Sequence, residues 1–436
     1  MLPLLLIPPA LWTAFALTPI RRPFAVATAG WVVGLPAQEL PLHVGIYTAV
    51  ATSVALAHGE VTTADLVGTG MAVVICAGLI ALLARHVAAQ RALDCAFEES
   101  ARGESARQES ARDEPVRAGG AGDTPTGRTA RVSAGGTTTG SATRHRTPWL
   151  TALFQPWPLR PRGVEARKGL TYGPEPRANR FDLYTGRGRD RARTRGVLIH
   201  IHGGHFRAGG PSRESRAMLF DHALRGWAAI STTYHLSPTP EGGFPQHLVD
   251  VKRLIHWIRT EGPRVDIPAD APIVVAGSSA GAHIAMMTAL TAGDPRYQPG
   301  FEHTDTTLAG AIGLYGYYGR LGAATKDVSD PVRHPAAGAP PMFVIHGTAD
   351  VYTPVRGSRR LVRHLRSGSP NPVIYAELPG AQYGFDAVQS VRYLAVVTAI
   401  RRFTDSLVAG LSVDSTTADR PRRTLPRNRG PHAVDR

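Results

Sequence analysis

Lysine is almost absent from this chain of 436 residues, in which Lys168, Lys252 and Lys326 are the only lysines. The net charge of +15 therefore comes from arginine. Such a skew is typical of a GC-rich genome rather than of a binding surface. No basic stripe interleaved with aromatic residues accompanies the excess, so the composition argues against nucleic-acid binding.

Cysteine is equally scarce. Cys76 lies in an apolar run and Cys95 follows just after it. Two cysteines so placed cannot build a disulfide framework or a cysteine-based metal site. We expect neither a cofactor nor a bound metal, and the sequence predicts no particular oligomeric state.

Charge is missing from long stretches of the first 85 positions, where three apolar runs cover residues 1–20, 40–57 and 66–84. About 20 apolar residues are needed to cross the hydrocarbon core of a bilayer. The third run fits best, because it holds 19 residues without a charge. We therefore predict a membrane-anchoring region over residues 1–95 with two to three transmembrane helices. The alternative interpretation is that these runs are buried helices of a soluble domain.

The flanking charges predict an orientation. Arg21 and Arg22 follow the first run, Arg85 and Arg91 follow the third, and the loop at 58–65 has no basic residue. The positive-inside rule then places both arginine clusters, and all that follows them, in the cytoplasm. A secretory signal fits poorly, because its positive charges should precede the apolar run.

Two segments have the composition of disordered chain. Residues 96–147 contain a Glu-Ser-Ala-Arg unit that begins at Glu99, Glu104 and Glu109, and Gly, Ser, Thr and Pro dominate afterwards. A period of five marks no single face of a helix, so we expect a flexible tether without a fixed pose for the next domain. Residues 411–436 form a second such segment, a basic tail.

Between these segments, short β-branched runs alternate with amphipathic ones. The predicted strands are 197–201, 228–233, 273–276, 309–314, 342–345 and 373–377, and residues 246–259 form a predicted helix. Alternation of this kind is typical of a mainly parallel sheet with helices on both faces. We therefore predict an α/β domain over residues 148–410.

A G-x-S-x-G motif at 277–281 lies between a predicted strand and a predicted helix, with Ser279 in its centre. In this setting the glycines relieve crowding around a strained turn that exposes the serine hydroxyl. The helix that follows directs its positive N-terminal end toward the same point. Ser279 is therefore the candidate nucleophile of an acyl-transfer site.

Two further motifs stand at strand ends. His202-Gly203-Gly204 offers backbone N–H groups that, with that of Ala280, would form an oxyanion hole. Asp350 follows a later strand, in the Ser…Asp order of this chemistry. The alternatives are a plain glycine turn, a turn-capping aspartate and, for His200, His202 and His205, a metal cluster. Successive strand residues point to opposite faces, which disfavours the metal.

These motifs resemble the hormone-sensitive-lipase and feruloyl-esterase-like branch of the α/β-hydrolases. Within that branch the chain is most similar to membrane-anchored actinobacterial carboxylesterases of the LipM/LipQ type. The resemblance runs from about Val197 to Phe403 and includes Tyr234-His235-Leu236-Ser237-Pro238 and Leu378-Pro379-Gly380-Ala381-Gln382. It implies the α/β-hydrolase fold, an acyl ester or lipid as substrate, and a Ser279–Asp350–histidine triad.

One departure from the family pattern concerns the base. Where the resemblance implies the catalytic histidine, before Gly384-Phe385-Asp386, this chain has Tyr383. Histidine can accept and return a proton near neutral pH, whereas a tyrosine of pKa about 10 stays protonated. A base from another loop, such as His205 or His283, is the alternative. The sequence thus predicts a membrane-tethered serine carboxylesterase or, as the rival, an impaired hydrolase that binds an ester, lipid or protein.

Overall fold

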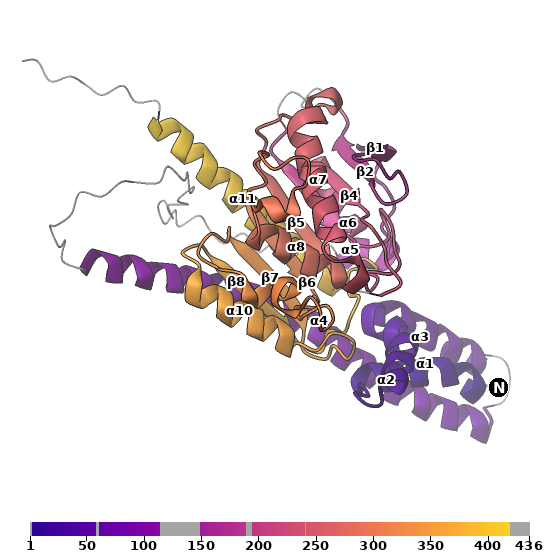
Figure 1. Cartoon of the computed structure of the whole chain (residues 1–436). Helices are drawn as coiled ribbons and strands as arrows, with labels where there is room; N and C mark the ends of the chain where they lie inside the picture. The colour runs from indigo at the N-terminus through magenta and orange to yellow at the C-terminus, as the bar shows by residue number, and fades with distance from the viewer. Residues whose placement is uncertain (1, 58–60, 114–148, 189–193, 240, 419–436) are drawn as a thin grey trace, which may run out of the picture.

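The computed structural model describes residues 2–57, 61–113, 149–188, 194–239 and 241–418 (Figure 1). One eight-stranded sheet has the order β1-β2-β4-β3-β5-β6-β7-β8. Strand β2 is antiparallel to both of its neighbours, and all other neighbours are parallel. The strands are β1 (Val164–Thr171), β2 (Arg180–Gly186), β3 (Val197–Ile201), β4 (Ala228–Thr232), β5 (Ile273–Ser278), β6 (Gly310–Leu314), β7 (Met342–Gly347) and β8 (Val373–Leu378).

Helices cover both faces of the sheet. Successive strand residues point to opposite faces, and in the buried strands the residues on both faces are apolar. In β3, Leu198 packs toward α6, α11 and part of α4, whereas Val197 and Ile199 pack toward α7 and α8. Helix α10 covers the second face near β7 and β8. The bounds are α6 (Arg216–Leu224), α7 (Gln246–Glu261), α8 (Ala280–Leu290), α9 (Lys326–Ser329), α10 (Arg356–Gly368) and α11 (Val391–Ala418). The predicted mainly parallel α/β architecture is confirmed.

The sequence did not reveal the first two strands. Strand β1 is an edge strand with only one neighbour, and it carries Arg167 and Lys168. Charged residues on an edge strand prevent unwanted pairing, but they also erase the apolar alternation by which a strand is recognised.

Four helices precede the sheet: α1 (Leu2–Leu17), α2 (Phe24–Glu39), α3 (Pro41–Ala57) and α4 (Thr63–Asp113). By length and apolar composition, α4 is long enough to cross a membrane over part of its length, and α2 and α3 together, bent by 80°, are a second candidate. Helix α1 has 16 residues and is shorter than a usual span. The described residues therefore offer one or two spans by this criterion, against the two to three predicted.

The prediction of a disordered tether from residue 96 is wrong for its first part. Helix α4 continues to Asp113, and Arg366 pairs with Glu99 at 2.8 Å between Nη1 and Oε1. Arg107 donates to the carbonyl oxygen of Ser369 at 3.1 Å. This end of α4 therefore lies along the sheet domain, while residues 114–148 fall outside the described part of the chain.

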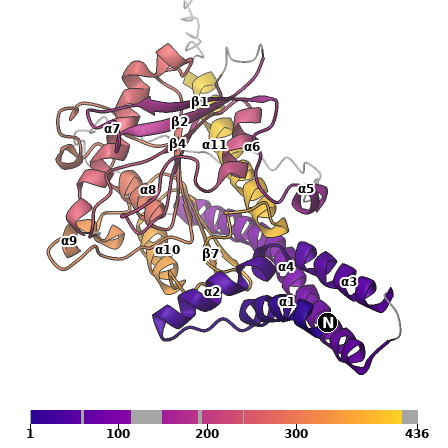
Figure 2. The same cartoon turned by 90° about the vertical axis from the view of Figure 1, so that its right-hand side faces the viewer.

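Two views show how the amino-terminal helices are arranged. Figure 1 shows α1, α2 and α3 gathered at one end of α4, and Figure 2 shows α2 lying across the end of the sheet domain below β7. At the other terminus, α11 runs to Ala418, seven residues past the predicted start of the tail at 411. Residues 419–436 of that predicted tail lie outside the described residues.

Candidate active site

Ser279 stands at the sharp turn between β5 and α8. Its backbone has φ 55° and ψ −114°, a strained conformation for a residue other than glycine. A side chain on Gly277 would collide with the backbone of Gly281, and one on Gly281 with the carbonyl oxygen of Ile201. Both glycines are therefore required by close backbone contacts, and the turn has the form expected of a nucleophile elbow.

Asp350 follows β7 on the same edge of the sheet. Its Oδ1 accepts from the backbone N–H groups of Tyr352 at 2.8 Å and Thr353 at 2.7 Å. Its Oδ2 accepts from the Thr353 hydroxyl at 2.8 Å and lies 3.3 Å from Nε2 of His346. The carboxylate is thus buried and held in one orientation by groups of its own loop.

Tyr383 occupies the loop after β8, where the expected histidine would lie. Its ring packs edge-on against Tyr315, at 4.8 Å between centroids, and lies tilted against Tyr352, at 4.7 Å between centroids. The phenol also interacts with the Ser279 side chain. Burial raises the pKa of Tyr383 well above its ordinary value, so the phenol stays protonated and cannot serve as a base near neutral pH.

His283, one of the two proposed replacements, is fully buried on α8. Its Nε2 lies 2.8 Å from the carbonyl oxygen of Ser329 and 3.1 Å from that of Gly319. Burial lowers the pKa of His283 to about 4. The ring is therefore a neutral packing group.

His205, the other proposed replacement, is exposed, and its ring centroid lies 6.4 Å from that of Tyr352.

The glycine loop passes directly beside Ser279. A Cβ built on Gly203 would lie 3.1 Å from Cβ of Ser279. The N–H of Gly203, however, already donates to the carboxylate of Glu214. Among the hydrogen bonds of the described residues, none engages the N–H of Gly204 or of Ala280. Those two of the three predicted donors are therefore available to an oxyanion.

Glu214 is a site residue that sequence reasoning missed. Its carboxylate is buried and pairs with Arg213 at 3.0 Å. No motif or periodicity marks it, because its contact with Gly203 depends on how the loop between β3 and α6 folds back. Burial, together with the charge of Asp386, raises the pKa of Glu214 to about 7.

This raised pKa predicts a pH effect on stability. Since the folded pKa of Glu214 lies above its ordinary value of 4.5, the folded chain holds this proton more tightly than the unfolded chain. Stability should therefore fall as the pH rises from about 4.5 to 7. Glu214→Gln still accepts the hydrogen bond from Gly203 but does not titrate, so we expect this variant to lack the part of the stability decrease that Glu214 causes. Melting temperatures of both proteins between pH 4.5 and 8 test it, and parallel profiles would contradict it.

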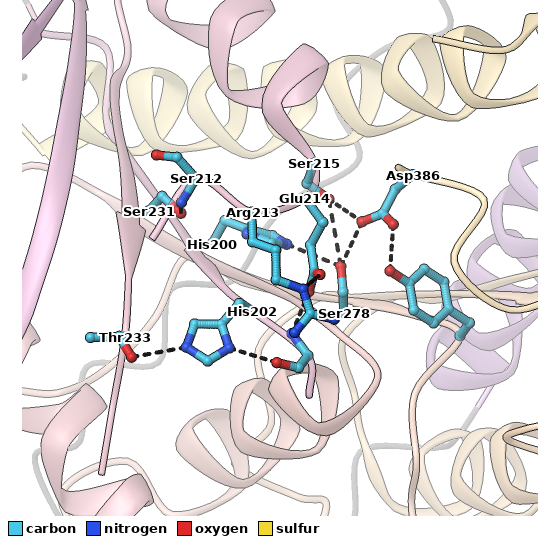
Figure 3. A network of polar contacts seen from close by, with 12 residues as sticks. His200, His202, Ser212, Arg213, Glu214, Ser215, Ser231, Thr233, Ser278 and Asp386 are labelled. Carbon is cyan, nitrogen blue, oxygen red and sulfur yellow. Dashed lines mark hydrogen bonds and ion pairs between the residues drawn. The ribbon is translucent and has the colours of Figure 1, made fainter. Parts of the chain in front are cut away.

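A buried polar network surrounds Ser278, the residue that precedes Ser279 (Figure 3). Asp386 accepts hydrogen bonds from Ser278 Oγ at 2.8 Å, from Ser215 Oγ and from the Tyr315 hydroxyl. Nε2 of His200 lies 3.0 Å from Ser278 Oγ. The network joins five segments of the chain and is closed to solvent, so it orients loops rather than performing chemistry.

His202 also serves the fold. Its Nε2 lies 2.9 Å from the Thr233 hydroxyl, and its ring stacks on Tyr234 at 4.7 Å. Burial lowers the pKa of His202 to about 4 and that of His200 to about 3. Both histidines are neutral and engaged with protein groups. The part of the chain that the structure describes holds no cluster of three residues suited to a metal ion.

Helix α2 lies against the loop that carries Tyr383. Trp31 donates from Nε1 to the carbonyl oxygen of Tyr383 at 3.0 Å, and Gln38 donates to that of Gly380 at 2.8 Å. Phe24 packs against Tyr352, with ring centroids 5.3 Å apart. The amino-terminal region thus contacts the loops that carry Tyr383 and Tyr352.

The same helix ends in a buried ion pair. Arg392 Nη1 lies 2.7 Å from Oε1 of Glu39, and both side chains are excluded from solvent. Ser390 donates to the other carboxylate oxygen at 2.9 Å. The pair joins the end of α2 to the start of α11 and fixes the amino-terminal helices to the sheet domain.

Comparisons with known proteins find similar sequences and structures. The model of the BD-FAE family matches residues 181–318, a range that includes the glycine loop and Ser279 but ends before Asp350 and Tyr383. The chain is 34% identical over 259 residues to a protein named probable carboxylic ester hydrolase LipM, and 32% identical over 259 residues to esterase LipQ, both of Mycobacterium tuberculosis. Each alignment covers 54% of this chain, and 59% and 61% of the relatives.

The chain therefore spans about three fifths of the length of these curated relatives. Among solved structures, esterase 2 of Thermogutta terrifontis aligns with a TM-score of 0.47 and 22% identity, over 57% of this chain and 96% of that one.

Proposed function

The chain carries an α/β-hydrolase domain that resembles the feruloyl-esterase-like family and the mycobacterial esterases, and from this premise we propose that it is a membrane-tethered hydrolase that cleaves acyl esters slowly at Ser279. One observation carries the proposal. Ser279 occupies a strained elbow beside two unengaged N–H groups, while the position of the base is held by Tyr383.

The chemistry follows from these groups. The Ser279 oxygen would attack the ester carbonyl, and the N–H groups of Gly204 and Ala280 would stabilise the resulting oxyanion. The hydroxyl proton must leave as the bond forms, and the alcohol must gain a proton as it departs. Tyr383 stays protonated and cannot accept the first proton. Losing this function typically lowers the rate by a factor on the order of 10⁴–10⁶ and leaves an acceleration of about 10³–10⁴ over the reaction in water.

The rival is a protein that binds an ester, a lipid or a partner without turnover. The aromatic packing of Tyr383 against Tyr315, Tyr352 and Trp31 favours it, because this packing holds the phenol in contact with Ser279. The two functions differ in whether Ser279 can be acylated at all.

Reaction with a fluorophosphonate probe separates them. We expect the wild-type chain to be labelled slowly, over hours rather than minutes, because the oxyanion donors are present and the base is absent. Ser279→Ala should abolish labelling, and Tyr383→His should accelerate it. Fast labelling of the wild type, lost in Ser279→Ala, would reveal a base that we have not recognised. A complete lack of labelling would favour the rival.

For the location, we propose a multi-pass cell-membrane protein with the hydrolase domain in the cytoplasm. Arg21, Arg22, Arg85 and Arg91 support this orientation. We expect a green fluorescent protein fused after Arg436 to fluoresce and an alkaline phosphatase fused there to be inactive. An active phosphatase fusion would place the domain outside and overturn the orientation.

A further inference from the structure

The exposed apolar side chains of the hydrolase domain are concentrated in one short stretch. Among the side chains described between residues 149 and 410, eight large apolar ones are exposed, and five of these lie between Trp149 and Leu159. Phe154 is 78% exposed, Leu150 72% and Trp157 63%. The stretch begins with α5 (Trp149–Phe154). Exposed apolar groups clustered in this way mark a contact surface rather than ordinary scatter.

This stretch is held in place by the rest of the domain. The backbone N–H of Gln389 donates to the carbonyl oxygen of Pro156 at 2.7 Å, and its side chain donates to that of Gln155 at the same distance. Ala152 is buried against Val391 and Leu394 of α11. Because one side of α5 is anchored, its exposed side has a definite direction.

Contacts with α3 determine the direction in which the exposed side of α5 points. His43 Nε2 lies 2.8 Å from the carbonyl oxygen of Leu153, and Leu42 packs with the same cluster as Ala152. Both residues belong to the first turn of α3, the end nearest the hydrolase domain, and Figure 2 shows α5 beside this helix. Further along α3, Ile46, Val50 and Val54 are each more than half exposed. The apolar surface of α5 therefore continues into that of the amino-terminal helices.

From this continuity we infer that the stretch Trp149–Leu159 lies in the interface of the lipid bilayer, at the level of the headgroups, and holds the active-site end of the hydrolase domain against the membrane. The inference rests on the membrane anchoring proposed above. Tryptophan suits this depth, since its ring is apolar and its N–H is polar. Arg160 and Arg162 follow directly and are exposed, which suits contact with anionic headgroups.

A spin-label measurement tests the inference. The full chain carries Cys76→Ala and Cys95→Ala and is placed in nanodiscs of phosphatidylcholine and phosphatidylglycerol. A nitroxide is attached in turn at Phe154→Cys, at Val74→Cys on the exposed apolar face of α4, and at Arg264→Cys. The Arg264 side chain is 80% exposed and follows α7, before β5 begins, at the sheet edge opposite Ser279. Collision rates with oxygen, which enters lipid, and with a water-soluble nickel chelate give the depth of each label.

We expect the ratio of the oxygen collision rate to the nickel-chelate collision rate to be highest for the Val74 label, lowest for the Arg264 label and intermediate for the Phe154 label. A Phe154 label that behaves like the Arg264 label would place the surface in water and overturn the inference. A Phe154 label shielded from both reagents would show that protein covers it, and would overturn the inference as well. A Val74 label that behaves like the Arg264 label would instead refute the membrane anchoring itself.

Discussion

Replacement of Tyr383 by histidine should raise ester turnover by at least roughly tenfold. Ser279 already stands in its elbow, Gly204 and Ala280 keep free N–H groups, and Asp350 is buried on the neighbouring loop. An imidazole at position 383 would add the one missing group of a cooperative unit. Hydrolysis of p-nitrophenyl butyrate by the purified full chain, expressed as kcat/KM, measures the effect.

Two controls define this result. Tyr383→Phe also removes the hydroxyl that interacts with Ser279 but supplies no base, so its rate should stay near that of the wild type. Adding Ser279→Ala to Tyr383→His should abolish the gain. One feature could reduce the gain, because the Asp350 carboxylate is already held by Thr353 and must turn to accept from an imidazole. A folded Tyr383→His variant no faster than Tyr383→Phe would contradict the account.

Removal of the Arg392 guanidinium should cost about 3–5 kcal/mol of stability, because the Glu39 carboxyl would be left buried without its partner. Arg392→Met keeps most of the side-chain volume and removes the charge. Chemical unfolding of the full chain in detergent, followed by tryptophan fluorescence, gives the difference in free energy.

The matched control is Arg359→Met. Arg359 pairs with Glu377 at 2.6 Å, but its side chain is half exposed, so water can replace the lost partner with little loss of stability. Equal destabilisation by the two variants would show that the Glu39–Arg392 pair does not stabilise the contact between α2 and α11. An Arg392→Met variant as stable as the wild type would also show that the pair does not stabilise this contact.

The central strands and the strained turn at Ser279 could be predicted because their signals are local. Strand β5 and helix α8 meet at a motif of five consecutive residues, and the crowding that requires Gly277 and Gly281 arises within that turn and the end of β3. The predicted boundaries of the parallel strands agree with the structure to within a few residues. An apolar run that ends in a glycine turn is enough to identify each of these elements.

The first part of the predicted linker is helical because its composition favours a helix, although its five-residue repeat marks no single helix face. Alanine, glutamate and arginine are strong helix formers, and the helix needs no new nucleus because it continues from an apolar segment. Contacts of Glu99 and Arg107 with residues more than 260 positions away then hold it along the domain. No local pattern reveals contacts at that separation.

The groups that surround Ser279 could not be predicted either, because their contacts join residues that are far apart in the sequence. Trp31 reaches Tyr383 across 352 positions, and Ser215 reaches Asp386 across 171. Glu214 approaches Gly203 only because the loop after β3 folds back on itself. Such contacts arise from tertiary packing, so the sequence could suggest which residue replaces the base but not which groups surround it.

The most direct test of the account is the pH dependence of the rate at which a fluorophosphonate labels Ser279. Without a histidine base, the wild-type rate should rise steadily with pH and show no inflection near 6.5, whereas Tyr383→His should acquire one. A wild-type rate that rises and then levels off with an apparent pKa between about 6 and 7 would contradict the account. If that inflection disappeared in Glu214→Gln, the base would be the buried carboxylate, whose pKa is about 7.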